Sequence, residues 1–251
     1  MESQYYQGKN IWIIGASEGI GRALTLALSD LGATLILSAR SAPALHDLNQ
    51  QLKKTAIIAP LDVAQADDFH ATTAFILNLQ VIDMIIYLPG YYQPGPLQDM
   101  QDDVIDTTLA INLRSVFTLL QCTLDYLVQH PTCQLAVFAS SAGYLGLPNA
   151  QPYAATKAAV INLLESAQAE YPQAKLRLIN PGFVKTRLTD KNKFYMPALL
   201  SAPQAADAVL KALMKNNFEI HFPKRLTLVL KLLKILPYSV YFYLLNKIKK
   251  R

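Results

Sequence analysis

The sequence is poor in cysteine, histidine and charge. Among 251 residues it has two cysteines and four histidines, and charged residues make up 16%. Cys122 and Cys133 lack the spacing of a metal site or of a disulfide-rich secreted domain, so we expect reduced, mostly buried thiols. The histidines are scattered without the spacing of metal ligands, so no metal site is expected. They are His46, His70, His130 and His221.

Signal, repeat and linker segments are missing as well. Residues 1–6 do not form a basic segment followed by an apolar run, so no secretory signal is predicted and a cytoplasmic location is expected. We find no internal repeat and no low-complexity linker. With 52% hydrophobic residues, the chain has the composition and length of one globular domain.

Short apolar runs alternate with helical patterns along most of the chain. The runs at 10–14, 34–37, 56–59, 83–87, 137–140, 176–179 and 219–222 are continuous, as in strands buried on both faces. Helical spacing occupies 19–31, 43–53, 67–78, 99–128 and the segment from 153 to just before Pro172. This alternation predicts an α/β protein, a Rossmann-type doubly wound parallel sheet with helices on both faces. We expect one domain over 1–222, followed by an extension over 223–251.

A glycine-rich turn separates the first strand from the first helix. It reads Gly15-Ala16-Ser17-Glu18-Gly19-Ile20-Gly21. Glycines at such a turn let the backbone approach a pyrophosphate, and the free N–H groups and dipole of the following helix favour negative charge. The strand–turn–helix context predicts a dinucleotide site.

The end of the second strand bears on the choice of nucleotide. An acidic residue there binds the ribose 2′-hydroxyl of NAD, whereas an arginine accommodates the 2′-phosphate of NADP. The chain has Ser38-Ala39-Arg40-Ser41 and no carboxylate. Arg40, with hydroxyl groups from the serines, therefore predicts NADP(H) in preference to NAD(H). Glu18 in the phosphate loop is an unfavourable neighbour for a further phosphate, and NAD remains the alternative.

A phenol and an ammonium group are spaced to meet on one helix face. Tyr153 and Lys157 are four residues apart, and Ser140 precedes the tyrosine by thirteen. We expect the Lys157 charge to lower the pKa of Tyr153, and the Ser140 hydroxyl to hold a substrate oxygen against the phenol. This arrangement could transfer a proton to or from an alcohol or carbonyl oxygen.

Over roughly residues 10–222 the chain resembles the short-chain dehydrogenases/reductases, in their short single-domain branch. The resemblance rests on the glycine loop, Asp62-Val63, Ile111-Asn112-Leu113, the Ser140, Tyr153 and Lys157 set, and Asn180-Pro181-Gly182 with Val184 and Thr186. It implies an oxidoreductase that moves a hydride between nicotinamide and a carbonyl or secondary alcohol, with Tyr153 as acid or base. Family habit also implies a homodimer or tetramer, formed through helices around 99–128 and 153–170.

The resemblance assigns roles to individual residues. It implies that Asn112, Ser140, Tyr153 and Lys157 are catalytic, and that Asn112 holds a water linking Lys157 to solvent. The implied cofactor contacts are Gly15, Ser17, Gly19, Ile20, Gly21, Ser38, Arg40, Asp62, Val63, Gly90, Tyr153, Lys157, Pro181, Gly182, Val184 and Thr186.

The chain departs from the family pattern after the fourth strand. Where the family usually has Asn-Asn-Ala-Gly, this chain has Tyr87-Leu88-Pro89-Gly90, and Ile14 replaces the usual threonine before the glycine loop. The change puts local cofactor contacts in doubt. The change also favours an alternative, a non-catalytic protein of the same fold that senses a cofactor. The full set of Asn112, Ser140, Tyr153 and Lys157 argues against this alternative.

Two segments bear on the substrate and on partners. Residues 185–201 mix basic, aromatic and methionine side chains, and they read either as a lid over an apolar or lipid-like substrate or as an ordinary surface excursion. The last segment, 224–251, is apolar but rich in lysine, and Pro237 and its lysines argue against a membrane span. It reads either as a peripheral anchor on the inner membrane face or as a cover for the pocket or a subunit interface. The net charge of +5 lies mostly there, so nucleic acid is not expected as a partner.

Overall fold

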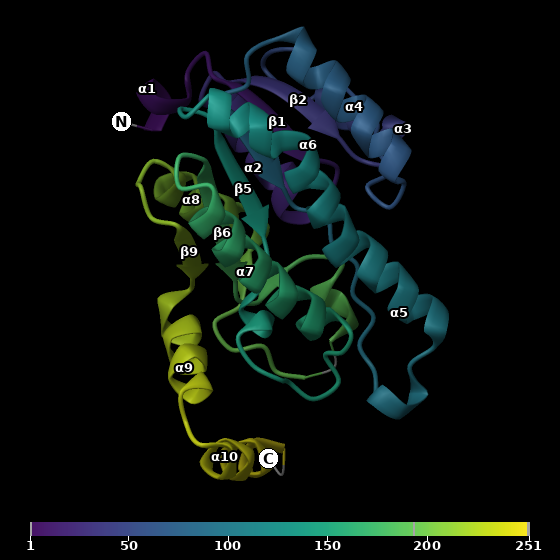
Figure 1. Ribbon diagram of the computed structural model, residues 1–251, viewed down its shortest axis with the longest axis vertical. Helices are drawn as coiled ribbons and strands as arrows, with labels where there is room; N and C mark the ends of the chain where they lie inside the picture. Colours follow the sequence, from purple (N-terminus) through teal and green to yellow (C-terminus); the bar gives the residue numbers. More distant parts are fainter. Residues whose placement is uncertain (1, 193, 250–251) are drawn as a thin grey trace.

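The computed structural model describes residues 2–192 and 194–249 (Figure 1). Seven parallel strands form the main sheet in the order β3-β2-β1-β4-β5-β6-β9. Their bounds are β1 Asn10–Ile14, β2 Thr34–Ser38, β3 Ile57–Ile58, β4 Met84–Tyr87, β5 Gln134–Phe138, β6 Lys175–Pro181 and β9 Glu219–Phe222. A small second sheet pairs β7, Val184–Lys185, with β8, Leu200–Ser201. The predicted doubly wound parallel sheet is confirmed.

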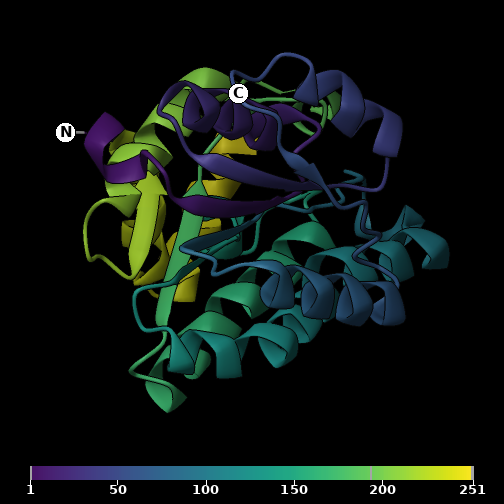
Figure 2. The same cartoon turned by 90° about the horizontal axis from the view of Figure 1, so that it is seen from above.

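Helices cover both faces of the sheet (Figure 2). Their bounds are α1 Glu2–Tyr6, α2 Gly19–Asp30, α3 Ala42–Asn49, α4 Ala66–Leu79, α5 Asp102–Leu109, α6 Ser115–Gln129, α7 Tyr153–Glu170, α8 Ala202–Leu213, α9 Lys224–Lys234 and α10 Tyr238–Lys249. Apolar residues of α4, α6 and α7 pack in one buried cluster, and those of α2, α3 and α8 pack in a second cluster on the opposite face. The strands between them are almost wholly buried, as their continuous apolar runs predict.

Three details differ from the sequence-based expectations. The helix expected over 99–128 is divided by a π-helical turn at Ala110–Arg114, which carries Asn112. Ser140 lies beyond the end of β5 and caps the short 3₁₀ helix Ser141–Gly143, because its Oγ accepts a hydrogen bond from the Ala142 N–H. Helix α8 was not predicted, although Ser201 and Gln204 form a complete capping box at its start.

The C-terminal extension forms two helices, α9 and α10. Both lie at the end of the molecule toward which β9 points (Figure 1). In the part of the chain that the structure describes, no helix is long and apolar enough to cross a membrane. Lys193 of the predicted lid, and residues 250–251, lie outside the described residues.

Candidate active site

The glycine turn after β1 has the backbone shape that close contact requires. Gly15 and Gly19 have φ values of +88° and +54°, in the left-handed region that favours glycine. A Cβ on Gly21 would lie 2.1 Å from the Gly15 carbonyl oxygen, so only glycine lets α2 begin so near the turn. The Glu18 side chain does not cap α2, which leaves the N–H groups of its first turn, beside Ser17 and Ile20, without a side-chain acceptor. A phosphate group fits such a helix start.

The segment after β6 lies directly against this turn. A Cβ on Gly19 would lie 3.1 Å from Cγ2 of Thr186, and Arg187 Nη1 is 2.6 Å from Glu18 Oε1. Pro181 ends β6 and Val184 is buried in β7, whereas Gly182 between them lies against Phe222 and Leu226. The structure therefore places Thr186 beside the predicted phosphate loop and pairs the charge of Glu18 with that of Arg187.

The end of β2 presents one exposed cation. Arg40 is exposed, and the neighbouring Ser41 hydroxyl accepts the Ala44 N–H and so caps α3. Ser38 is fully buried, and its Oγ accepts a 2.9 Å hydrogen bond from Trp12 Nε1. Its hydroxyl therefore faces the core, which corrects the expectation that it adds a donor beside Arg40.

Asp62 and Val63, two further predicted cofactor contacts, follow β3. The Asp62 carboxylate accepts the Ala64 N–H at 3.0 Å, and Val63 is buried among core residues. The Asp62 N–H in turn donates to Asp68 at 2.8 Å. Both residues lie at the same edge of the sheet as Arg40, because β2 and β3 are parallel neighbours.

Tyr153 and Ser140 lie together beyond β5. Tyr153 begins α7, and its phenol lies near the Ser140 side chain, which favours the ionised phenol. Gly143 lets the short 3₁₀ helix after Ser140 pack closely on α7, because a Cβ there would lie 2.7 Å from the backbone of Lys157. The structure therefore places Tyr153 near the serine thirteen residues earlier, while a direct role for the pair stays a prediction.

Lys157 and Tyr153 share one face of α7, but the Lys157 ammonium bonds to a backbone carbonyl and not to the Tyr153 hydroxyl. The Lys157 ammonium donates to the Phe138 carbonyl at 2.9 Å, and its nitrogen is 5.6 Å from the centre of the Tyr153 ring. Burial raises the pKa of Tyr153 to about 12, although this side chain keeps some exposed surface, while the nearby Ser140 side chain opposes the rise. Lys157 thus does not lower the pKa of Tyr153 as predicted. Burial also lowers the pKa of Lys157 to about 8.

Asn112 is held from both sides by backbone and side-chain partners. Its Oδ1 accepts the Tyr91 N–H at 2.7 Å, and its Nδ2 donates to the Tyr91 carbonyl at 2.9 Å. Nδ2 also donates to Thr156 Oγ1 at 3.2 Å, which ties the π turn to α7. A Cβ on Gly90 would lie 3.9 Å from both Asn112 Oδ1 and Lys157 Nζ, so these three residues surround one small space.

The loop after β4 and the segment after β7 meet above Tyr153. The Tyr92 ring lies edge-on to the Tyr153 ring with centroids 5.0 Å apart, and its hydroxyl donates to Asn192 Oδ1 at 2.9 Å. Lys191 Nζ donates to the Tyr92 carbonyl at 2.7 Å. Tyr92 thus forms a wall of the site, which agrees with its expected place on the loop opposite residues 185–201. Its position depends on contacts between residues a hundred apart in the chain, which no local pattern encodes.

Comparisons with known proteins identify the family of this chain. The family model for short chain dehydrogenases matches residues 9–194. An uncharacterized oxidoreductase of Staphylococcus epidermidis is 31% identical over 210 residues, covering 82% of this chain and 90% of the relative. A 3-oxoacyl-[acyl-carrier-protein] reductase of Rickettsia typhi is 29% identical and covers 74% of this chain and 77% of its own length.

A solved structure shares the fold along most of the chain. The alcohol dehydrogenase of the archaeon Thermococcus sibiricus, complexed with 5-hydroxy-NADP, has a TM-score of 0.77 and 26% identity. The match covers 86% of this chain and 96% of that structure. Together with the matched family model, these findings show that the chain belongs to the short chain dehydrogenase family and is an NAD(P)-dependent oxidoreductase.

Proposed function

We propose that the protein is an NADP(H)-dependent carbonyl reductase acting between a carbonyl group and a secondary alcohol. The observation that carries this proposal is the meeting of Tyr153, Ser140, Lys157 and Asn112 at the end of β5, next to the glycine turn. Bound nicotinamide dinucleotide would supply or accept the hydride. The exposed Arg40, in a position without a competing carboxylate, supports NADP(H) over NAD(H).

Each catalytic residue has a proton or a position to control. Tyr153, which is protonated at neutral pH, gives its proton to the carbonyl oxygen as the alcohol forms. Ser140 holds that oxygen against the phenol through its hydroxyl. Lys157 would hold the nicotinamide ribose with its ammonium, and Asn112 would keep a path for protons from solvent beside Gly90. The reverse reaction takes the same steps in the opposite order.

We further propose an apolar or lipid-like substrate. Tyr92 gives the site an aromatic wall. The segment 185–201, which contacts Tyr92 through Asn192, also carries the exposed aromatic residues Phe194 and Tyr195. The relative from Rickettsia typhi is named as a 3-oxoacyl-[acyl-carrier-protein] reductase, and a 3-oxoacyl group carries its ketone on an acyl chain. A cytoplasmic location and a homodimer or tetramer are part of the same proposal. A hollow along α6 and α7, lined by leucines such as Leu124 and Leu163 and by polar residues such as Asp125 and Glu170, offers a mixed surface for the dimer.

A panel of carbonyl compounds tests the function. Short ketones, steroid ketones, long-chain ketones and 3-oxoacyl thioesters are mixed with the protein and with NADPH or NADH, and loss of cofactor absorbance is followed. We expect turnover with the longer compounds and a preference for NADPH. Consumption of neither cofactor with any compound, while both bind, would contradict a carbonyl reductase, and faster turnover with NADH would contradict the cofactor assignment.

A further inference from the structure

The last segment of the chain carries charge of one sign. Residues 223–251 contain eight basic residues and no acidic residue, whereas residues 1–222 contain fifteen basic and eighteen acidic residues. The segment therefore has a formal charge of +8, the rest of the chain has −3, and together they give the net +5. A partner of this segment must tolerate or attract concentrated positive charge.

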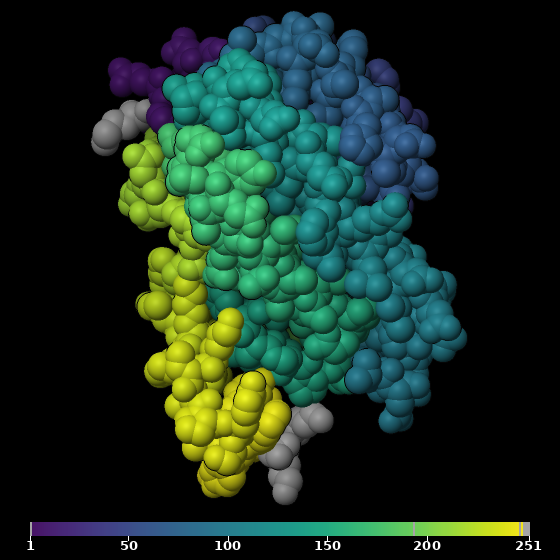
Figure 3. All heavy atoms as spheres, in the orientation of Figure 1, coloured from purple at the N-terminus to yellow at the C-terminus, as the bar shows by residue number. Residues whose placement is uncertain are grey.

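The same segment exposes a concentration of large apolar side chains. Of the seventeen exposed large hydrophobic residues in the described part of the chain, eight lie between 228 and 243. Two of them lie four apart on α9, one follows that helix directly, and two lie four apart on α10, and we call these five the docking face. They are Leu228, Leu232, Ile235, Tyr238 and Phe242, which are 55%, 60%, 76%, 79% and 55% exposed. Figure 3 shows α9 and α10 as one continuous surface at the lower left of the molecule.

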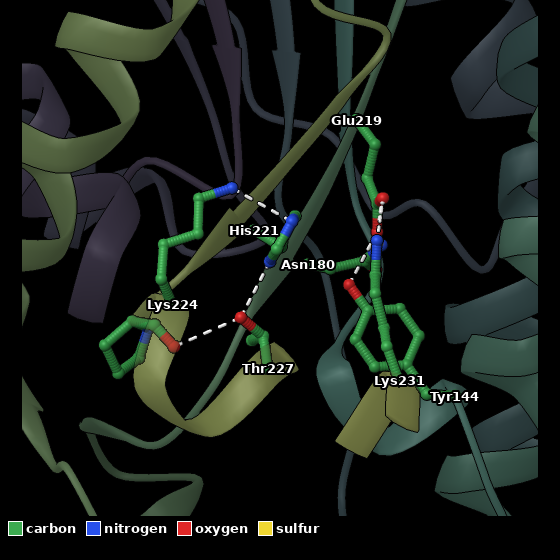
Figure 4. Close-up of polar contacts among 8 residues, drawn as sticks. Tyr144, Asn180, Glu219, His221, Lys224, Thr227 and Lys231 are labelled. Carbon is green, nitrogen blue, oxygen red and sulfur yellow. Dashed lines mark hydrogen bonds and ion pairs between the residues drawn. The ribbon is translucent and has the colours of Figure 1, made fainter. Parts of the chain in front are cut away.

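The opposite sides of these helices are fixed to the body of the protein. Thr227 is buried, and its hydroxyl is 2.7 Å from Nδ1 of His221 on β9 (Figure 4). Leu226 lies over the turn after β6, where a Cβ on Gly182 would be 2.8 Å from its Cδ2. The Tyr241 hydroxyl donates to the Gly146 carbonyl. The helices therefore have a fixed orientation, with the docking face outward.

A half-buried polar contact also ties α9 to the loop that follows Ser140. Lys231 forms an ion pair with Glu219, and the Tyr144 hydroxyl donates to the same carboxylate at 2.5 Å (Figure 4). Asn180 donates to Glu219 as well, at 2.9 Å. Because Tyr144 is only four residues from Ser140, the docking face lies at the same end of the protein as the candidate active site.

We infer that the docking face binds the surface of an anionic lipid bilayer, with α9 and α10 lying in the interface. Apolar and aromatic side chains next to lysines are the composition of helices that rest at this depth. Exposed cations at Arg225, Lys234 and Lys247 would meet acidic headgroups. Pairing with the same segment of a second copy is disfavoured, because it would bring two segments of charge +8 together. Nucleic acid is disfavoured because aliphatic side chains make no favourable contacts with its phosphates. The inference does not depend on the catalytic assignment.

Sedimentation of the full-length protein with vesicles tests this inference. One set of vesicles is pure phosphatidylcholine, and the other contains about one third phosphatidylglycerol. We expect the protein to sediment with the anionic vesicles and to bind the neutral ones at least tenfold more weakly. The double variant Leu232→Glu with Ile235→Glu should bind anionic vesicles at least tenfold more weakly, because it places carboxylates on the apolar surface.

Matched variants separate this surface from a general change in charge or hydrophobicity. Val81→Glu with Leu97→Glu introduces the same charges at residues that are 61% and 73% exposed on the body, and it should bind like the wild type. Lys234→Gln with Lys247→Gln should weaken binding to anionic vesicles, whereas Lys54→Gln with Lys215→Gln should not. Circular dichroism checks that each variant is folded.

Two results would overturn the inference. One is wild-type protein that stays in the supernatant with anionic vesicles. If light scattering then shows a dimer that Leu232→Glu with Ile235→Glu dissociates, the docking face pairs with a second copy instead of a membrane. The other is equal loss of vesicle binding in the docking-face variant and in the Val81→Glu, Leu97→Glu control. Since cofactor and substrate are absent from these assays, neither result bears on the proposed function.

Discussion

The Tyr87 hydroxyl donates a 2.5 Å hydrogen bond to Oγ of Ser115, and both side chains are buried. Ser115 in turn donates to the Ile111 carbonyl at 2.6 Å, one residue before Asn112. Tyr87 stands where the family usually has an asparagine. In this chain the tyrosine thus ties the end of β4 to the π turn that carries Asn112.

Removing either partner of the Tyr87–Ser115 hydrogen bond should lower the free energy of unfolding, but by different amounts. Ser115→Ala leaves the Tyr87 hydroxyl buried without an acceptor, which costs about 1–3 kcal/mol. Tyr87→Phe removes the donor and leaves Ser115 bonded to Ile111, so we expect a loss of about 1 kcal/mol. Urea denaturation of both variants and of the double variant measures this. A double variant much less stable than Ser115→Ala would contradict the predicted coupling.

Tyr153→Phe should abolish turnover while the cofactor still binds. The change removes the only proton that the phenol could give to the carbonyl oxygen, so kcat should fall by about 10²–10⁴-fold. Cofactor fluorescence should show an NADPH affinity close to that of the wild type. Tyr238→Phe, at a residue of α10 that is 79% exposed, is the matched control and should keep full activity. Near-normal kcat in Tyr153→Phe would remove the tyrosine from the mechanism.

The pH dependence of carbonyl reduction should report Lys157. Burial lowers its pKa to about 8, so the free enzyme carries the ammonium below that pH and loses it above. Because the ammonium is proposed to hold the nicotinamide ribose, kcat/KM for NADPH should be constant below about pH 8 and fall as the pH rises further. Tyr153, with a pKa of about 12, stays protonated over this range. A flat profile from pH 7 to 10 would contradict this role for Lys157.

Lys157 should also make stability depend on pH. Its ordinary pKa of 10.5 is higher than its folded pKa of about 8, so the unfolded chain binds more protons between these values. The contribution of Lys157 to the free energy of unfolding therefore rises with pH over that window. Lys157→Met, measured by thermal unfolding at pH 7.5 and 10, should be stabilised relative to the wild type more at the lower pH.

Arg40→Ala should weaken NADPH binding and leave NADH binding almost unchanged. Arginine binds phosphate with a planar fork, and the 2′-phosphate is the group that only NADPH carries. We expect the Kd for NADPH to rise at least tenfold in titrations of cofactor fluorescence. Arg225→Ala, which removes an exposed arginine from α9, is the control. Equal weakening of both cofactors by Arg40→Ala would place the arginine elsewhere on the nucleotide.

Gly21→Ala should prevent cofactor binding with little change elsewhere. The added methyl group would lie 2.1 Å from the Gly15 carbonyl oxygen, so the glycine turn or the start of α2 must move. Gly146→Ala is a matched control, since a Cβ there meets nothing within 4 Å. Both variants are measured by cofactor titration and thermal unfolding. Normal NADPH affinity in Gly21→Ala would contradict the prediction, because it would show that cofactor binding does not depend on the backbone shape of the glycine turn.

Residues close together in the chain determined much of this protein. The continuous apolar runs predicted the parallel sheet, because strands buried on both faces cannot alternate in polarity. The glycine turn and the spacing of Tyr153 and Lys157 are local motifs, and the structure places them as expected relative to β1 and α7. Each depends on backbone geometry within a few residues, which a short pattern can encode.

Contacts between distant segments were decided only by the tertiary structure. Burial makes the pKa of Tyr153 high although a lysine lies on the same helix face, and the packing of Trp12 turns the Ser38 hydroxyl into the core. The tie from Tyr87 to Ser115 and the bond from Tyr92 to Asn192 join residues 28 and 100 positions apart. In the C-terminal segment, the sequence supplied the lysines and the apolar residues. The fold alone decided which side chains face the protein and which face outward.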